Sequence, residues 1–61
     1  MVDVISSYHS KHDNGFLVIA IALGRYYIYN GIFKKEKNAI RVSKQVNERR
    51  SIDAKHWIQQ S

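Results

Sequence analysis

The chain has 61 residues, no cysteine and no proline, and its ten Lys and Arg outnumber its five Asp and Glu, giving a net charge of +5. This length predicts a single domain, residues 1–61, with a thin core that has neither disulfides nor thiolate ligands for a structural zinc ion. We therefore expect oligomerisation, as a homodimer, to supplement the core. The lack of cysteine also favours the cytoplasm over an oxidising compartment.

The longest apolar run, Phe16 to Leu23, is much shorter than the ~20 residues of a membrane-spanning helix. Residues Met1 to Asn14 lack the positively charged start of a secretory signal. The sequence therefore predicts a mature, soluble protein that has no membrane partner.

Residues 1–14 are expected to hold an N-terminal edge strand or loop. Val2, Val4 and Ile5 favour a short strand, whereas turn-forming Ser, Asp and Asn residues predict a loop around Tyr8–His12.

The segment Phe16–Ala22 is rich in β-branched residues and lies between two glycines, which favours a strand covered on both faces, with a buried helix as the alternative. Gly24 suits a two-residue hairpin turn, and Tyr26–Tyr29 reads as the next strand. Asn30-Gly31 predicts a second hairpin, after which Ile32–Lys35 would pair back.

Glu36–Asn38 is polar enough to predict a loop, and Ala39–Ser43 resumes the character of a strand. The antiparallel sheet would thus span residues 16–43. Residues 51–60 predict a helix, with Ser51 as N-cap, Asp53 in the first turn, and Trp57 and Ile58 on one apolar face. The expected fold class is α+β: a small antiparallel β-meander of three to four strands with one C-terminal α-helix packed on one face.

Positive charge is concentrated in the middle of the chain, because Arg25 to Arg50 carries eight cations and two carboxylates, a net +6. Interleaved tyrosines suggest a sheet surface that holds phosphates with cations and stacks bases on aromatic rings. The sequence therefore predicts a nucleic-acid-binding protein, with DNA slightly preferred over RNA. The expected binding residues are Arg25, Tyr27, Tyr29, Lys34, Lys35, Lys37, Arg41, Lys44, Arg49 and Arg50. The competing interpretation is that the lysines only solvate the surface and the tyrosines pack as cross-strand pairs.

Arg49 and Arg50 directly precede the expected C-terminal helix. They are predicted either to clamp a phosphate at that helix start or to form an exposed basic connection.

Catalysis is not expected. The chain has no cysteine nucleophile, no serine elbow and no phosphate-binding glycine loop, and its carboxylates are dispersed. His9 and His12, beside Asp13, are spaced i, i+3 but lack a third ligand, so a solvated loop is the preferred interpretation. No metal ion and no cofactor are predicted.

The nucleic-acid hypothesis fits an accessory or regulatory factor of a phage or mobile element. The alternative is a protein-interaction module, such as a small phage- or plasmid-encoded inhibitor of a host protein. Trp57, Tyr26 and Tyr29 favour that alternative, because Trp and Tyr dominate hot spots at protein interfaces.

Two family resemblances concern the later part of the chain. The order of Tyr26–Gly31, a basic strand, Ile52-Asp53-Ala54 and Trp57 resembles the three-stranded, one-helix DNA-binding modules at the N-terminus of phage integrases. That resemblance implies a sheet in the major groove, with roles for Arg25, Tyr27 and Arg41. Ile40–Ser43 followed by Ile52, Trp57 and Ile58 is similar to the C-terminal half of the carbon storage regulator family, dimeric RNA-binding translational repressors. Each resemblance indicates a class of protein, and neither assigns the chain to a family.

Overall fold

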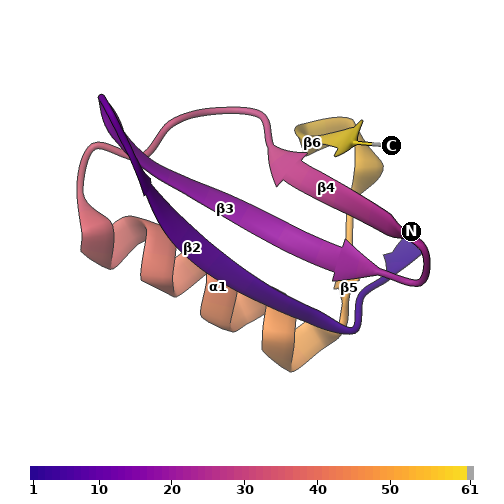
Figure 1. Cartoon of the computed structure of the whole chain (residues 1–61). Coiled ribbons are helices and arrows are strands. Elements are labelled where there is room, and N and C mark those ends of the chain that lie inside the picture. Colours follow the sequence, from indigo (N-terminus) through magenta and orange to yellow (C-terminus); the bar gives the residue numbers. More distant parts are fainter. Residues whose placement is uncertain (61) are drawn as a thin grey trace.

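A computed structural model describes residues 1–60, in which one helix lies across an antiparallel sheet (Figure 1). The sheet has four strands in the order β2-β3-β4-β6, and β1 pairs separately with β5. The expected α+β class, a small antiparallel meander with one helix packed on one face, is confirmed. The elements in chain order are β1 (Val2–Asp3), β2 (Ser6–His12), β3 (Gly15–Ala22), β4 (Arg25–Tyr29), α1 (Glu36–Arg49), β5 (Ser51–Ile52), the 3-10 turn η1 (Ala54–His56) and β6 (Trp57–Gln60).

The strands β3 and β4 form where the sequence predicts strands. Ala22 pairs with Arg25 across the two-residue turn Leu23-Gly24, which confirms the expected hairpin. Gly24 has a φ of 72°, a conformation that glycine adopts without the steric cost of a side chain. The expectation that β3 is covered on both faces is wrong, because α1 covers only one of them.

The loop expected at Tyr8–His12 is a strand. In β2, Ser6 to His12 pair with Ile21 to Gly15 of β3, and only Asp13 and Asn14 form the turn. The polar side chains of β2 fit a strand here because β2 is the edge of the sheet and most of them face solvent.

The segment predicted as a loop and a strand, residues 36–43, is the first half of α1. Its buried positions are Ala39, Ser43 and Val46, with Val42 packed beside them, a spacing typical of one helical face. The helical period is hard to read in the sequence because one buried position is the polar Ser43. The β-branched Ile40 and Val42 meanwhile favour a strand by local preference.

The C-terminal helix predicted at residues 51–60 is also wrong, since this segment forms β5, η1 and β6. Tyr29 of β4 pairs with Trp57, and Ile28 pairs with Ile58, so the tail satisfies the backbone groups on the free edge of β4. The sequence of residues 51–60 does not show that β4 has a free edge to pair with. The spacing of the apolar residues in this segment, taken alone, favoured a helix.

Asn30-Gly31 does not form a hairpin. The Asn30 N–H donates to the His56 carbonyl oxygen at 2.8 Å, and the chain then crosses to α1. Ile32–Lys35 was expected to pair back as a strand, but only Phe33 does so, by exchanging two backbone hydrogen bonds with Phe16. Gly15 allows this contact, because a Cβ on Gly15 would collide with the Phe33 carbonyl oxygen.

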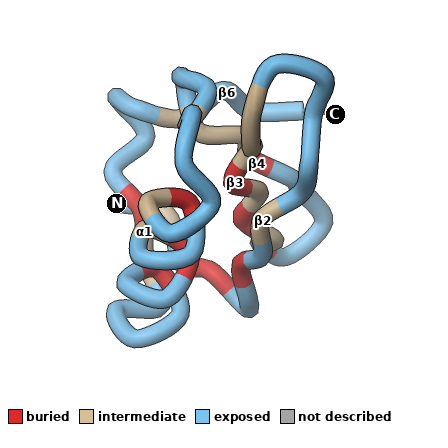
Figure 2. Tube along the Cα trace, turned by 90° about the vertical axis from the view of Figure 1, so that its left-hand side faces the viewer, coloured by how far each residue is buried: buried red, intermediate tan, exposed pale blue. Residues whose placement is uncertain are grey.

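The core lies between α1 and the sheet (Figure 2). Strand β3 contributes Val18, Ala20 and Ala22, all nearly or fully inaccessible, and β4 contributes Tyr27, which is 4 % exposed. Small side chains on β3 allow the helix to approach closely, and the tyrosine ring fills the space beside them. The core is thin, because Val18 is the largest side chain that is fully buried.

Asn47 joins α1 to the edge strand β2. Its side-chain Oδ1 accepts from the Ser7 N–H at 2.6 Å, and its Nδ2 donates to the Ser7 carbonyl oxygen at 3.1 Å. The carboxamide thereby satisfies both backbone groups of a residue on the outer edge of the sheet, as a neighbouring strand would.

We expect Asn47→Ala to lower the free energy of unfolding by about 1–2 kcal/mol, because two hydrogen bonds to the backbone are lost. Asn38→Ala is the matched control, since no side-chain hydrogen bond of Asn38 is present in residues 1–60. Urea denaturation measures both variants. Equal stability of the two variants would contradict the anchoring role.

Arg50 ends α1 in the left-handed conformation, with a φ of 56°. Glycine avoids most of the steric cost of this conformation, so Arg50→Gly should be more stable than Arg50→Ala by about 1 kcal/mol. Both variants remove the same charge, which isolates the backbone effect. At Gln45, an exposed position inside α1, the order of the glycine and alanine variants should reverse. Thermal or urea unfolding of the four variants tests the prediction, which fails if alanine is preferred at both positions.

Candidate nucleic-acid interface

Three of the predicted binding residues lie on the outer face of α1. Because Ala39, Ser43 and Val46 face the sheet, the helical rotation of 100° per residue points Lys37, Arg41 and Lys44 the opposite way. All three are exposed, and Glu48 continues the same face one turn later. Lys34 and Lys35 are exposed immediately before the helix. We call Lys34, Lys35, Lys37, Arg41 and Lys44 the basic helix surface.

Within residues 1–60, none of the five cations of this surface is in an ion pair. The two ion pairs of residues 1–60 both involve a histidine, with Glu36 3.2 Å from His9 and Asp53 3.5 Å from His56. Lys37 and Arg41, spaced i, i+4, repel each other and cost the helix a few tenths of a kcal/mol. The arrangement therefore holds positive charge on one side of the molecule at a small cost in stability.

The predicted sheet surface of Arg25, Tyr27, Tyr29 and Arg41 does not exist. Arg25, Tyr27 and Tyr29 do share one face of β4, as alternation predicts, but it is on the side of the sheet where α1 and the core lie. Tyr27 is buried in the core, and Tyr29 is half-buried, stacked on Phe33 with its ring centroid 5.2 Å away. Their rings are largely withdrawn from solvent, so the sheet surface that the integrase resemblance implied is not formed.

The arginines predicted at a helix start are at a helix end. Arg49 lies in the last turn of α1 and Arg50 is its C-cap. Positive charge at this end complements the helix dipole, so both side chains have a structural role there. Arg25 begins β4, whereas Lys34 follows the opposite end of that strand, so Arg25 is separate from the basic helix surface.

The histidines do not gather. His9 and His12 point to opposite faces of β2 because their spacing in a strand is odd. Residues 1–60 contain no group of three or more His, Asp or Glu side chains placed to hold a metal ion.

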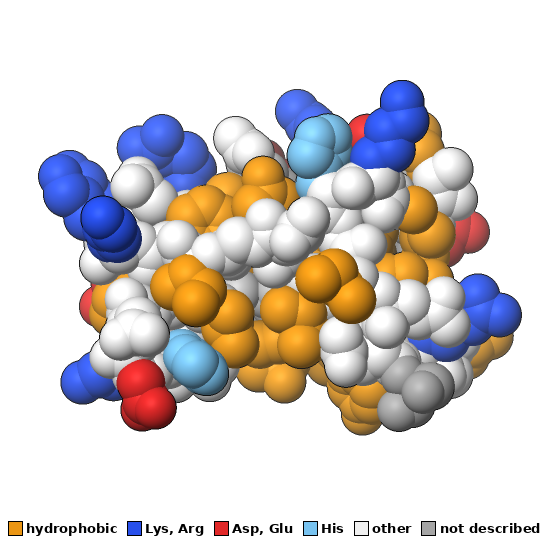
Figure 3. Space-filling model, turned by 90° about the horizontal axis from the view of Figure 1, so that it is seen from above, with side chains coloured by type: hydrophobic (Ala, Val, Ile, Leu, Met, Phe, Trp, Pro, Cys, Tyr) orange, Lys and Arg blue, Asp and Glu red, His pale blue; other side chains and the backbone are white. Residues whose placement is uncertain are grey.

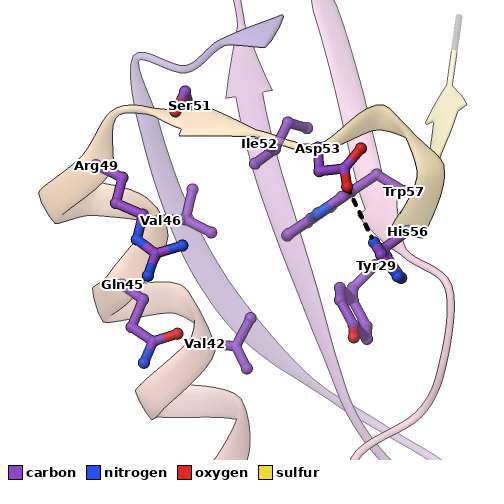
Figure 4. A pocket seen from close by; sticks show the side chains of 10 residues that line it. All are labelled: Tyr29, Val42, Gln45, Val46, Arg49, Ser51, Ile52, Asp53, His56 and Trp57. Carbon is purple, nitrogen blue, oxygen red and sulfur yellow. Dashed lines mark ion pairs between the residues drawn. The ribbon is translucent and has the colours of Figure 1, made fainter. Parts of the chain in front are cut away.

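A hollow of about 250 Å³ lies between the C-terminal half of α1 and the η1–β6 tail (Figure 4). Val42 and Val46 of α1 face Trp57, whose ring meets Tyr29 edge-on with centroids 5.2 Å apart. Arg49 lies at one side of the hollow and the Asp53–His56 pair at the other. The hollow is smaller than most ligand pockets. Its polar lining residues are Gln45, Arg49, Ser51, Asp53 and His56. Trp57, expected as an interface hot spot, is half-buried in its wall.

The face of the sheet away from α1 is not predicted from the sequence, and it carries Tyr8, Ile19, Ile28 and Ile58 in one cross-strand row. The signal is present within β3, where larger and smaller apolar residues alternate. Its meaning depends on which face α1 covers, and the sequence does not show that.

No protein family, curated protein or solved structure matches this chain. Within residues 1–60, no helix is both long enough and apolar enough to cross a membrane.

Asp53 caps η1 by accepting a hydrogen bond from the Lys55 N–H at 3.0 Å, and this bond holds the pKa of Asp53 below its ordinary value of 3.8. A lowered pKa in the folded state stabilises the protein above the pKa of the unfolded chain, and the contribution is lost as pH falls through the folded pKa. We therefore expect Asp53→Ala to be less stable than the wild type at pH 7, with the difference shrinking as the pH falls through the folded pKa of Asp53. Asp53→Asn, which keeps the acceptor, should change less at pH 7. Carbon-detected NMR titration measures the pKa directly, and a value above 3.8 would contradict the capping assignment.

Proposed function

We propose that this protein binds double-stranded DNA through the basic helix surface. The observation that carries the proposal is that Lys37, Arg41 and Lys44 lie in line on the exposed side of one helix, with Lys34 and Lys35 beside them. Five exposed cations without carboxylate partners in residues 1–60 are suited to phosphates, which release counterions when neutralised.

Two further features support a ligand for this surface. Lys34, Lys35 and Lys37 surround the N-terminal end of α1, where the helix dipole disfavours positive charge. Lys37 and Arg41 add repulsion within the helix. A polyanion relieves both costs on binding, whereas a surface that only needs solvation is served as well by paired charges of both signs.

The helical setting favours DNA over RNA. The major groove of B-form DNA is about 12 Å wide and admits a helix, while the major groove of A-form RNA is too narrow for one. We assign phosphate contacts to the basic helix surface and no reading of base sequence. An accessory or regulatory factor that acts on DNA in the cytoplasm, in the setting of a phage or mobile element, is the role we propose.

The test is fluorescence anisotropy with a labelled 20-base-pair DNA duplex across a range of salt concentrations. If three to five phosphates are contacted, a plot of the logarithm of the association constant against the logarithm of the salt concentration should have a slope of about −3 to −4.5. The triple variant Lys37→Gln/Arg41→Gln/Lys44→Gln should bind more weakly and reduce the magnitude of that slope by about 3. Gln has nearly the helix preference of Lys and Arg, so α1 should be retained.

The matched control is Lys11→Gln/Arg25→Gln/Lys55→Gln, which removes the same charge from exposed positions outside α1. This control should keep most of the affinity and the slope. If both triple variants weaken binding equally, or if the wild type does not bind at about 50 mM salt, the assignment to the basic helix surface is wrong. A duplex RNA of the same sequence should bind less tightly than the DNA.

A further inference from the structure

The side of the sheet away from α1 is apolar and uncovered. Tyr8, Ile19, Ile28 and Ile58 form a row that runs across all four strands, since each is paired directly with the next. Figure 3 views the molecule from above, with α1 on the lower side in Figure 1, and shows hydrophobic side chains across the middle with Lys and Arg mostly at the margins. We call the large apolar side chains of this side the open face. Its members are Tyr8, Leu17, Ile19, Ile21, Tyr26, Ile28 and Ile58.

The open face carries larger apolar residues than the core does. Within β3, the side toward α1 presents Val18, Ala20 and Ala22, and the open side presents Leu17, Ile19 and Ile21. Three of the seven open-face residues, Tyr8, Tyr26 and Ile58, remain 47 %, 53 % and 49 % exposed. If this side of the sheet stayed in water, the largest apolar side chains of the sheet would contribute little burial to the fold. A third layer is therefore expected to cover them.

The distribution of charged residues indicates which molecule forms this third layer. The β-strand positions of the open face include no Lys, Arg, Asp or Glu, and His12 is the histidine among them. Two copies of a chain with a net charge of +5 repel each other through most surfaces, but the open faces meet without like charges in contact. A flat anionic membrane cannot contact the open face and the basic helix surface together, because α1 lies on the other side of the sheet.

The size of the open face agrees with a small dimer. The four strands contain 24 residues. Each residue occupies about 16 Å² of the sheet plane, because the rise along a strand is about 3.4 Å and neighbouring strands lie about 4.8 Å apart. The plane is therefore about 400 Å² per copy, and projecting side chains increase its accessible area. Two copies approach the lower limit of about 1,000 Å² for a specific interface.

We propose that two copies of this chain pair through their open faces, sheet on sheet, to form a homodimer with the layer order helix, sheet, sheet, helix. Aligned sheets pack about 10 Å apart with interleaved side chains, so Ile19 and Ile28 near the middle of each row become fully buried. The contact is isologous, the same surface on both partners. This inference is independent of DNA binding and goes beyond the proposed function.

Sedimentation equilibrium of nuclease-treated protein between about 1 µM and 1 mM tests the proposal. The expected mass is twice the 7.1 kDa of one chain. Ile58→Lys and Tyr8→Lys each bury an unpaired charge only in the dimer, so each should weaken dimerisation by at least about 100-fold. Both sites are half exposed in one copy, and circular dichroism should show that the fold is kept.

The matched control is Ile40→Lys, at an isoleucine of α1 that is 45 % exposed and lies away from the open face. It should leave the dimer intact. A single-chain mass at 1 mM would overturn the proposal, as would a dimer that Ile58→Lys and Tyr8→Lys leave unchanged. If the monomer instead forms a stable complex with another protein through Ile58, the open face belongs to a different partner and the homodimer is excluded.

A measurement on the unmodified chain covers the case in which these variants fail to fold. In a mixture of isotope-labelled and unlabelled protein, intermolecular nuclear Overhauser effects should connect the methyl groups of Ile19, Ile21 and Ile28 with those of the partner. Intermolecular contacts that involve only α1 or the strand edges would contradict the face-to-face arrangement.

Discussion

The contact between α1 and the small side chains of β3 is the interaction on which the rest of the structure depends. Ala20 and Ala22 let the helix approach the sheet closely, and Val46 and Tyr27 pack around them. This contact determines which side of every strand is buried, because alternation carries the choice from one strand to the next. It also determines which side of the helix is exposed.

Two surfaces of opposite character follow from that one contact. On the helix, burial of Ala39, Ser43 and Val46 leaves Lys37 and Arg41 facing water. On the sheet, burial of the small side chains of β3 leaves the large ones exposed. A chain of this size has too little interior for both sets of apolar residues, so one set lies outside the two-layer core. In the proposed dimer the open faces would be enclosed, and the two basic helix surfaces would lie on opposite outer sides.

The edges of the sheet are supported by two different means. On β2, the Asn47 carboxamide binds the backbone of Ser7 as a strand would. On β4, the tail returns as β6, and Asp53 caps the turn that brings Trp57 against Tyr29. Both supports come from residues far along the chain from the strand they protect, so the sheet is complete only when the whole chain has folded.

The local sequence determined the strands β3 and β4, the turn at Gly24 and the concentration of cations in the middle of the chain, because glycine conformation, the preference of β-branched and aromatic residues for strands, and charge are local properties. The tertiary structure alone decided that residues 36–49 are a helix. The polar Ser43 interrupts the apolar spacing of this segment, and its place on the buried face is evident only once the helix packs against the sheet. The tail became a strand because the edge of β4 offers backbone partners that lie 28 or more residues away in sequence. For the same reason the cations and tyrosines predicted to share one surface of the sheet lie in different places, because which face of a strand is buried depends on the element packed against it.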